Sequence, residues 1–233
     1  MSVNFEHYRT INTVIILGVI LMAIPYKTKQ PVYLKDPSGR FANMLNPEYA
    51  NAETQGHSLQ LKTPTILNFP FTPTISVIQS ANYSSYDLTH TNFQQRAFEN
   101  SSNMDLNITA PMLVRNEEEA LYIYNASLFL RSAMKMTFGQ DANPGMPPPV
   151  LRFYSHGIYE NVPCMIRDFT WNLDSDIDYV EIEDPKNKKK IMRIPVMNMF
   201  VLSLTTTYSP KSIRENFSVQ EYLKGNLKDQ GYV

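Results

Sequence analysis

The chain has 233 residues and a net charge of −1, and only 18% of its residues are charged, against about 25% in typical globular proteins. This balance argues against a general nucleic-acid-binding protein, and a single cysteine, Cys164, excludes a scaffold held by internal disulfides. Prolines outnumber glycines by 16 to 8 and aromatic residues are frequent, which favours an extended, mainly β protein over a helical bundle.

The most apolar run, Thr13–Ile24, lies near the N-terminus and ends before Pro25. It is shorter than the about 20 residues of a membrane-spanning helix. Only one positive side chain, Arg9, precedes it, and no small-x-small cleavage site follows, so it is a poor signal peptide. We expect a strand buried on both faces or a segment covered by a partner subunit. Membrane anchoring or export is the alternative.

Residues 26–64 are polar and irregular, with four prolines and turn signals such as Ser38-Gly39. This composition suits an arm that reaches over a neighbouring subunit, and it suits a surface loop equally well. The predicted organisation is therefore an N-terminal extension over residues 1–67 and a folded domain over residues 68–233.

Extended segments are predicted next at Thr74–Gln79, Tyr83–Asn92 and Phe93–Phe98. Residues 104–110 carry apolar side chains at every second position, which is typical of a strand with one buried face.

One helix is predicted, over residues 116–138. Asn116 is placed to cap it, Glu117–Glu119 lie where the helix dipole favours negative charge, and Gly139 is placed to end it. The face expected to pack on a sheet carries Leu121, Tyr124 and Leu128, widened by Ala120, Ile123, Leu130 and Met134.

The stretch from Pro147 to Pro210 reads as successive strands and turns. The predicted parts are Val150–Tyr154, a turn at His156-Gly157, Val162–Leu173, Ile177–Glu183, a polar tip at Asp184–Lys188, and Ile191–Tyr208. In the last of these, Phe200, Leu202 and Leu204 alternate with Ser203, Thr205 and Thr207, so one face is expected to be buried and the other to meet water or a polar partner. The tail, residues 217–233, is expected to be a packed flap without a helix.

An acidic turn contains Asp174, Asp176 and Asp178, at the spacing of a calcium loop. Such a loop needs Gly at its sixth position and Glu at its twelfth, and this chain has Tyr179 and Pro185 there. The segment is therefore interpreted as a solvated turn or an acidic patch on a subunit surface.

A basic tip follows, at Lys186, Lys188, Lys189 and Lys190. It is interpreted as a soluble loop, or as a contact with the acidic surface 174–183 of the next copy in a ring.

No catalytic chemistry is indicated by the remaining motifs. The four histidines lack metal-ligand spacing, and no phosphate-binding glycine loop, nucleophile elbow or paired-carboxylate signature occurs. We expect no enzyme activity, no cofactor and no metal.

An ordered set of short segments spans residues 68–233. It comprises Phe69–Pro73, Leu88–Asn92, Phe129–Ser132, Pro147–Leu151, Asn161–Pro163, Asp176–Val180, Tyr208–Pro210, Phe217-Ser218 and Tyr222–Gly225. This set resembles the baseplate tail-tube proteins, of tube-initiator and tube-cap type, of T4-like contractile-tailed phages, especially cyanophage-like forms. The resemblance does not extend to the N-terminal residues.

The resemblance implies a tail-tube fold of packed β-sheets with one flanking α-helix, in which strands from six copies join into a β-barrel ring. It implies a structural virion protein of the tail or baseplate, assembled in the host cytoplasm, through whose lumen DNA passes during ejection. The implied partners are further copies of the chain, the baseplate hub, adjacent tail tube proteins, and baseplate wedge or sheath proteins, without stable membrane association. The candidate barrel strands are 161–173, 197–208, 74–79 and 104–110.

The rival hypothesis from the residues alone is an exported β-sandwich adhesin or surface-binding module, with Thr13–Ile24 as its signal.

Overall fold

A computed structural model of the chain describes residues 32–41, 66–141, 143–184 and 187–233, with the backbone only at 187–189. The strands in these ranges are β1 (Tyr33–Lys35), β2 (Ile66–Asn68), β3 (Thr74–Ile78), β4 (Ala81–Tyr86), β5 (Gln95–Ser101), β6 (Asp105–Leu113), β7 (Leu151–Ser155), β8 (Tyr159–Trp171), β9 (Tyr179–Asp184), β10 (Asn187–Pro195) and β11 (Met197–Thr206). The helices are α3 (Glu117–Ser132), α4 (Pro210–Asn216), α5 (Val219–Leu223) and the 3₁₀ turn η1 (Lys228–Gln230).

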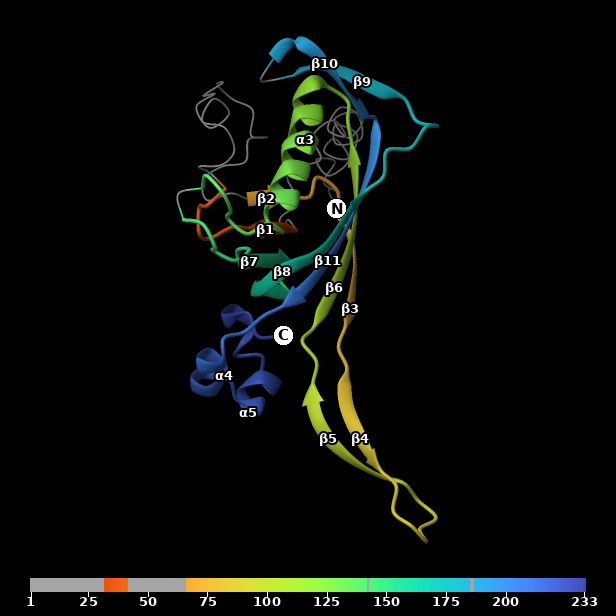
Figure 1. Ribbon diagram of the computed structural model, residues 1–233, viewed down its shortest axis with the longest axis vertical. Coiled ribbons are helices and arrows are strands. Elements are labelled where there is room, and N and C mark those ends of the chain that lie inside the picture. Colours follow the sequence, from red (N-terminus) through yellow and green to blue (C-terminus); the bar gives the residue numbers. More distant parts are fainter. Residues whose placement is uncertain (1–31, 42–65, 142, 185–186) are drawn as a thin grey trace, which may run out of the picture.

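The largest element is a seven-stranded sheet in the order β2-β1-β7-β8-β11-β6-β3, and every strand pairing in the described chain is antiparallel. Two further hairpins, β9–β10 and β4–β5, extend from it at opposite ends of the long axis (Figure 1). Helix α3 lies against one side of the sheet. The prediction of a mainly β protein with one flanking helix is confirmed.

The core lies between α3 and the facing side of the sheet. Along β6 and β11 every second side chain is buried, because successive residues of a strand point to opposite faces. Phe200, Leu202 and Leu204 are fully buried, as the alternation predicts. Phe200 makes edge-on ring contacts with Phe169 and Trp171 of β8.

Helix α3 begins as predicted but ends earlier. The side chain of Asn116 accepts a hydrogen bond from the Glu119 backbone N–H at 2.8 Å. The prediction that the helix continues to Phe138 is wrong, since it ends at Ser132. The reason is long-range: the backbone N–H of Thr137 donates to Met146 and its carbonyl accepts from the linker, so this segment pairs there instead of continuing the helix.

The buried face of α3 is predicted in part. Ala120, Ile123 and Leu130 are fully buried as expected, whereas Leu121, Tyr124, Leu128 and Met134 are only half-buried. Ala126, Ser127 and Phe129 are fully buried and were not predicted to be. The helix is covered on a second side: Phe41 meets Phe129 edge-on, and the Tyr122 hydroxyl donates to the Asn68 carbonyl at 2.5 Å. A helix packed on two sides buries a wider stripe than the sequence pattern predicts.

The predicted closing strand, residues 191–208, is two strands in two different sheets. Pro195 has no backbone N–H and ends β10, and at Val196 the chain crosses to the main sheet. Val196 donates to the Asp178 carbonyl at 2.8 Å, and the buried Asn198 amide donates to the Pro195 carbonyl at 2.6 Å. These bonds fix the crossing point.

The prediction of a tail without a helix is wrong, since residues 217–233 contain α5 and η1, and α4 comes immediately before them. Ser209 caps α4 by accepting from the Ser212 N–H, and Pro210 occupies the first helical position, where its missing N–H costs nothing. Stacked rings of Tyr208 and Tyr232, 5.0 Å apart, hold the tail against the end of the main sheet.

Strand β1 falls in the segment that the sequence predicts as irregular. It pairs with both β2 and β7, and Leu34 is fully buried. The predicted apolar strand Thr13–Ile24 lies outside the described residues, and the division of the chain at residue 67 stays a prediction.

Candidate functional site

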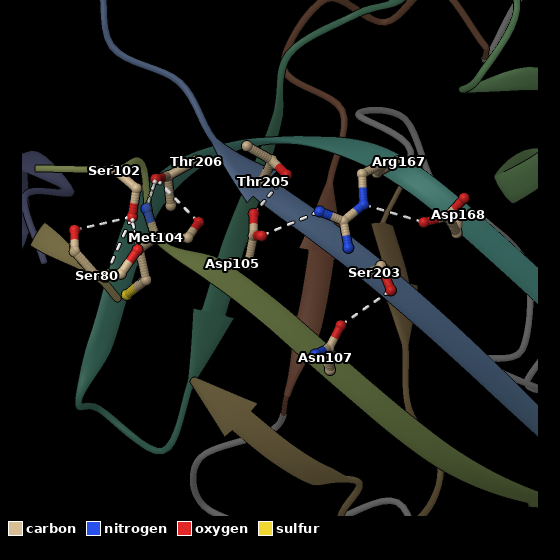
Figure 2. Close-up of polar contacts among 10 residues, drawn as sticks. All are labelled: Ser80, Ser102, Met104, Asp105, Asn107, Arg167, Asp168, Ser203, Thr205 and Thr206. Carbon is tan, nitrogen blue, oxygen red and sulfur yellow. Dashed lines mark hydrogen bonds and ion pairs between the residues drawn. The ribbon is translucent and has the colours of Figure 1, made fainter. Parts of the chain in front are cut away.

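The side of the sheet opposite α3 is not covered by any other part of the described chain, and it is polar over β6 and β11. Thr205 donates to the Asp105 carboxylate at 2.7 Å, and Ser203 donates to the Asn107 amide oxygen at 2.9 Å (Figure 2). These residues are directly opposite each other in the ladder. The face therefore consists of rows of hydrogen-bonded polar side chains open to solvent, which we call the polar face.

A β-bulge places a charged group on this face. The β8–β11 register shifts between Ser203, opposite Asp168, and Leu204, opposite Ile166, so Arg167 is the extra residue. Its guanidinium lies 3.0 Å from Asp105 and 3.0 Å from Asp168 (Figure 2). Exposed pairs of this kind add little stability, so their main effect is to set the charge of the surface.

The hydrogen bond from Thr205 is the largest cause that lowers the pKa of Asp105. Burial acts in the opposite direction, and Arg167 lowers the pKa of Asp105 further. Asp105 is therefore ionised at neutral pH. Its contribution to stability is present above the ordinary carboxyl pKa and is lost as the pH falls through the lowered value.

We expect Thr205→Val to raise the pKa of Asp105 toward the ordinary carboxyl value, because the isosteric side chain keeps the packing and removes the donor. A titration of the Asp105 carboxyl carbon by NMR measures the shift. Ser203→Ala is the matched control, since its hydroxyl bonds Asn107 and its loss should leave the pKa of Asp105 unchanged. An equal shift in both variants would contradict the assignment of the cause.

Farther along β11 the same face becomes apolar. Met197, Met199 and Val201 are exposed, and Pro111 of β6 lies opposite Met199. Pro111 is tolerated here because β3 pairs with β6 only as far as Thr109.

The free strands of one edge carry no charge and no proline against further pairing, and a register shift in this border puts its extra residue, Glu99, in the paired strand β5. Strand β3 is the edge strand, and β4 continues along the same border where the chain leaves the sheet (Figure 1). Residues 74–86 contain no charged residue and no proline. At about 3.3 Å per residue, this free edge is on the order of 40 Å long. Charges, prolines and bulges normally block such edges, so an unblocked one is a template for a further strand.

The β4–β5 hairpin, which we call the arm (residues 81–101), projects beyond the sheet (Figure 1). It is held at its base by the Ser80 and Ser102 hydroxyls, 2.8 Å apart, and by Thr206, whose hydroxyl accepts from the Met104 N–H at 3.0 Å (Figure 2). The arm exposes Tyr83, Tyr86, Leu88, Phe93 and Phe98. An isolated two-stranded hairpin is marginally stable, so an exposed apolar arm indicates a surface that a partner covers.

The acidic turn and the basic tip are not brought together within one chain. Asp174, Asp176 and Asp178 are exposed between β8 and β9, and Lys190 is exposed in β10. Lys188 and Lys189 lie in β10 by backbone, and Lys186 lies outside the described residues. The two segments are at opposite ends of the β9–β10 hairpin, so any contact between them joins two copies.

No grouping of His, Cys, Asp and Glu that could hold a metal ion occurs in the described ranges. His156 lies in the predicted turn, with its Nδ1 2.6 Å from the Ser155 hydroxyl. None of the helices described is long and apolar enough to cross a membrane. The expectations that the chain has no catalytic residues and no cofactor stay predictions.

Sequence reasoning missed the bulge at Arg167, the free edge, and the pairing of β4 with β5 into an arm. The extended segments predicted at Tyr83–Asn92 and Phe93–Phe98 overlap β4 and β5, but residues 87–94 between these strands are not extended strand. The free edge has a signal in the sequence, which is the absence of charge and proline over residues 74–86. The bulge and the strand pairing of the arm depend on the register and on which strands pair.

No protein-family model matches the sequence, and no curated protein matches it. Among solved structures, the chain is similar to one in the structure described as "Tail of empty GTA particle computed with helical refinement, C6 symmetry". The identity is 7%, the match covers 78% of this chain and 95% of that chain, and the TM-score is 0.33. At that score the two chains share too little structure for the likeness to support an argument.

Proposed function

We propose that the chain is a structural subunit of a phage tail that assembles with copies of itself into a sixfold ring at the junction of baseplate and tail tube. There it nucleates or continues the tube through which DNA is ejected. The observation that carries the proposal is the free edge at β3 and β4, which is long, uncharged and without proline. The tail-tube family, the sixfold symmetry and the place in the particle are what the resemblance of the ordered segments over residues 68–233 implies.

The free edge favours a ring over a monomer because its backbone N–H and C=O groups on that side have no strand partner in the described chain. Pairing with a different edge of the next copy is a heterologous contact, and such contacts form a ring when the rotation between copies closes. A closed ring has no free edges left to aggregate.

The polar face suits the wall of a lumen that DNA crosses without binding. Near its centre, Asp105 and Asp168 outnumber the one guanidinium of Arg167. A strongly basic wall would retain DNA, since neutralising phosphates releases counterions. A polar, slightly acidic wall lets DNA pass.

In this proposal the protein is not an enzyme and binds no cofactor. Its partners are other copies, the baseplate hub, the adjacent tail tube proteins, and wedge or sheath proteins. It is a virion component assembled in the host cytoplasm.

Electron microscopy of the purified full chain, and of tails from particles that carry it, tests the proposal. The expected result is a sixfold ring with an open centre, found on the tail axis in the particle. A chain that stays monomeric at high concentration and is absent from tails would overturn it.

The basic tip offers a separate test of how copies meet. If Lys186, Lys188, Lys189 and Lys190 contact the acidic surface 174–183 of the next copy, reversing all four to glutamate should weaken the ring by like-charge repulsion. We expect the ring to dissociate at about tenfold higher protein concentration or more, corresponding to about 1.4 kcal/mol. Sedimentation velocity measures this. Raising the salt concentration should reduce the difference from the unmodified chain, because salt screens exposed charges. A ring unaffected by the reversal would show that the tip is only a solvated turn.

A further inference from the structure

The C-terminal helices expose an apolar surface that nothing in the described chain covers. No residue of α4 or α5 is buried, and within these helices and the turn between them Ile213, Phe217, Val219, Tyr222 and Leu223 are exposed. We call these five residues the C-terminal patch. Helices of this length do not persist on their own, so packing must hold them.

The patch is held against the end of the main sheet by ring contacts and one hydroxyl pair. The Phe217 ring lies 5.6 Å from Tyr232 and 5.9 Å from Tyr222, and Tyr232 stacks on Tyr208 at the end of the main sheet. The Ser212 and Tyr232 hydroxyls are 2.7 Å apart. The patch is therefore held in place before any partner arrives, which reduces the entropy that binding costs.

The arm is another unpartnered apolar surface of the described chain, and it differs from the patch in shape. Phe93, at its tip, is 84% exposed, and the ring pair of Tyr83 and Phe98 is also open to solvent. The arm and the patch both lie toward the end of the molecule drawn at the bottom of Figure 1.

We propose that the arm of one copy docks on the C-terminal patch of a neighbouring copy. This rests on the proposed function only in taking a second copy as the partner. Each chain carries one arm and one C-terminal patch, so every copy can use its arm on one neighbour and its patch on another, as a heterologous contact requires. The arm projects beyond α4 and α5 along the long axis (Figure 1), so the copy that supplies the patch is displaced along that axis as well as rotated about it.

Charge supports the pairing of these two surfaces. The arm carries one arginine against one aspartate and one glutamate, a net charge of −1. Residues 210–224 carry three basic side chains against two glutamates, a net charge of +1. Lys224 and Glu221 already pair with each other, which leaves Lys211 and Arg214 without an ion pair at 4.0 Å or less in the described chain. Aromatic residues and arginine are enriched where protein surfaces meet, and the patch combines Phe217 and Tyr222 with the neighbouring Arg214.

Cysteine trapping between separately tagged chains tests the contact. One chain carries Phe93→Cys and the other carries Leu223→Cys, both at highly exposed positions. The native Cys164 does not interfere, because it is fully buried and desolvation raises its pKa to about 12, which keeps the thiol protonated. The control partner for Phe93→Cys is Phe138→Cys, since Phe138 is 79% exposed and Leu223 is 80% exposed.

We expect the 93–223 disulfide between different chains to form at least tenfold faster than the 93–138 disulfide in mixed full-length protein. Equal rates, or crosslinks dominated by 93–93 pairs, would overturn the docking proposal. A sixfold ring without the 93–223 crosslink would refute the docking and leave the proposed function intact. The crosslink in an assembly without sixfold symmetry would support the docking and refute the proposed ring.

Discussion

Ser76→Lys combined with Ile78→Lys is expected to yield a folded monomer that no longer forms rings. Both side chains lie on β3 and are exposed, and both share the polar face, since they are opposite Asn107 and Asp105. The substitutions therefore do not enter the core. They add two positive charges to an edge that has none, and lysine on an edge strand is the common natural means of preventing strand addition.

The expected effect is large because a closed ring needs all of its subunit interfaces. If each interface loses about 1.4 kcal/mol of binding free energy, its association constant falls about tenfold, and six weakened interfaces leave almost no closed ring. Light scattering coupled to size-exclusion chromatography measures the mass in solution. Far-ultraviolet circular dichroism checks that the strand content is unchanged.

The matched control places the same charges on the same face but away from the edge. Val201→Lys combined with Ser203→Lys changes polar-face positions of β11, which lies between β6 and β8 and is paired with both strands at these two residues. The control should still form rings. If the control loses the ring and the β3 variant keeps it, the contact lies on the face and not on the edge.

The alternation of apolar and polar residues predicted the central strands because it reports which face of a strand is buried. Leu106 and Ile108 in β6, and Leu202 and Leu204 in β11, are fully buried as the pattern requires. The start of α3 was predictable for a similar reason, since the cap at Asn116 involves residues three positions apart.

The features that were not predicted depend on contacts distant in the sequence. Helix α3 ends at Ser132 because Thr137 bonds the linker near Met146. Strand β1 forms because β2 and β7 lie on its two sides. Local patterns contain no information on which segment will supply such a partner.

In the candidate site, too, local patterns predicted some features, and contacts distant in the sequence determined the others. The polar residues of β11 were visible in the sequence, and their exposure on the uncovered face follows from the alternation. That β3 is an edge strand was not visible, because the place of a strand in a sheet depends on the pairing of all the others. Neither was the bulge at Arg167, since it arises from the register between β8 and β11.

Phe200→Ala is expected to cost about 3–5 kcal/mol of unfolding free energy, the usual range for removing a fully buried phenylalanine. The ring lies in the middle of the core and contacts Phe169 at 5.2 Å and Trp171 at 5.6 Å between centroids. Its removal opens a cavity between two rings that β8 holds in place. Urea denaturation in the Ser76→Lys, Ile78→Lys background measures the loss, because a monomer gives a free energy that does not depend on protein concentration.

The control for this prediction is Phe93→Ala, which removes the same side chain from an exposed position and should change stability by less than about 0.5 kcal/mol. The comparison also tests the orientation of the sheet. Phe200 and Ser203 belong to one strand and point to opposite faces, so Phe200 lies on the helix side of the sheet and Ser203 on the polar face. A loss near 1 kcal/mol at Phe200 would mean that the helix side is not the core. The polar face would then not be the free surface on which the proposed lumen depends.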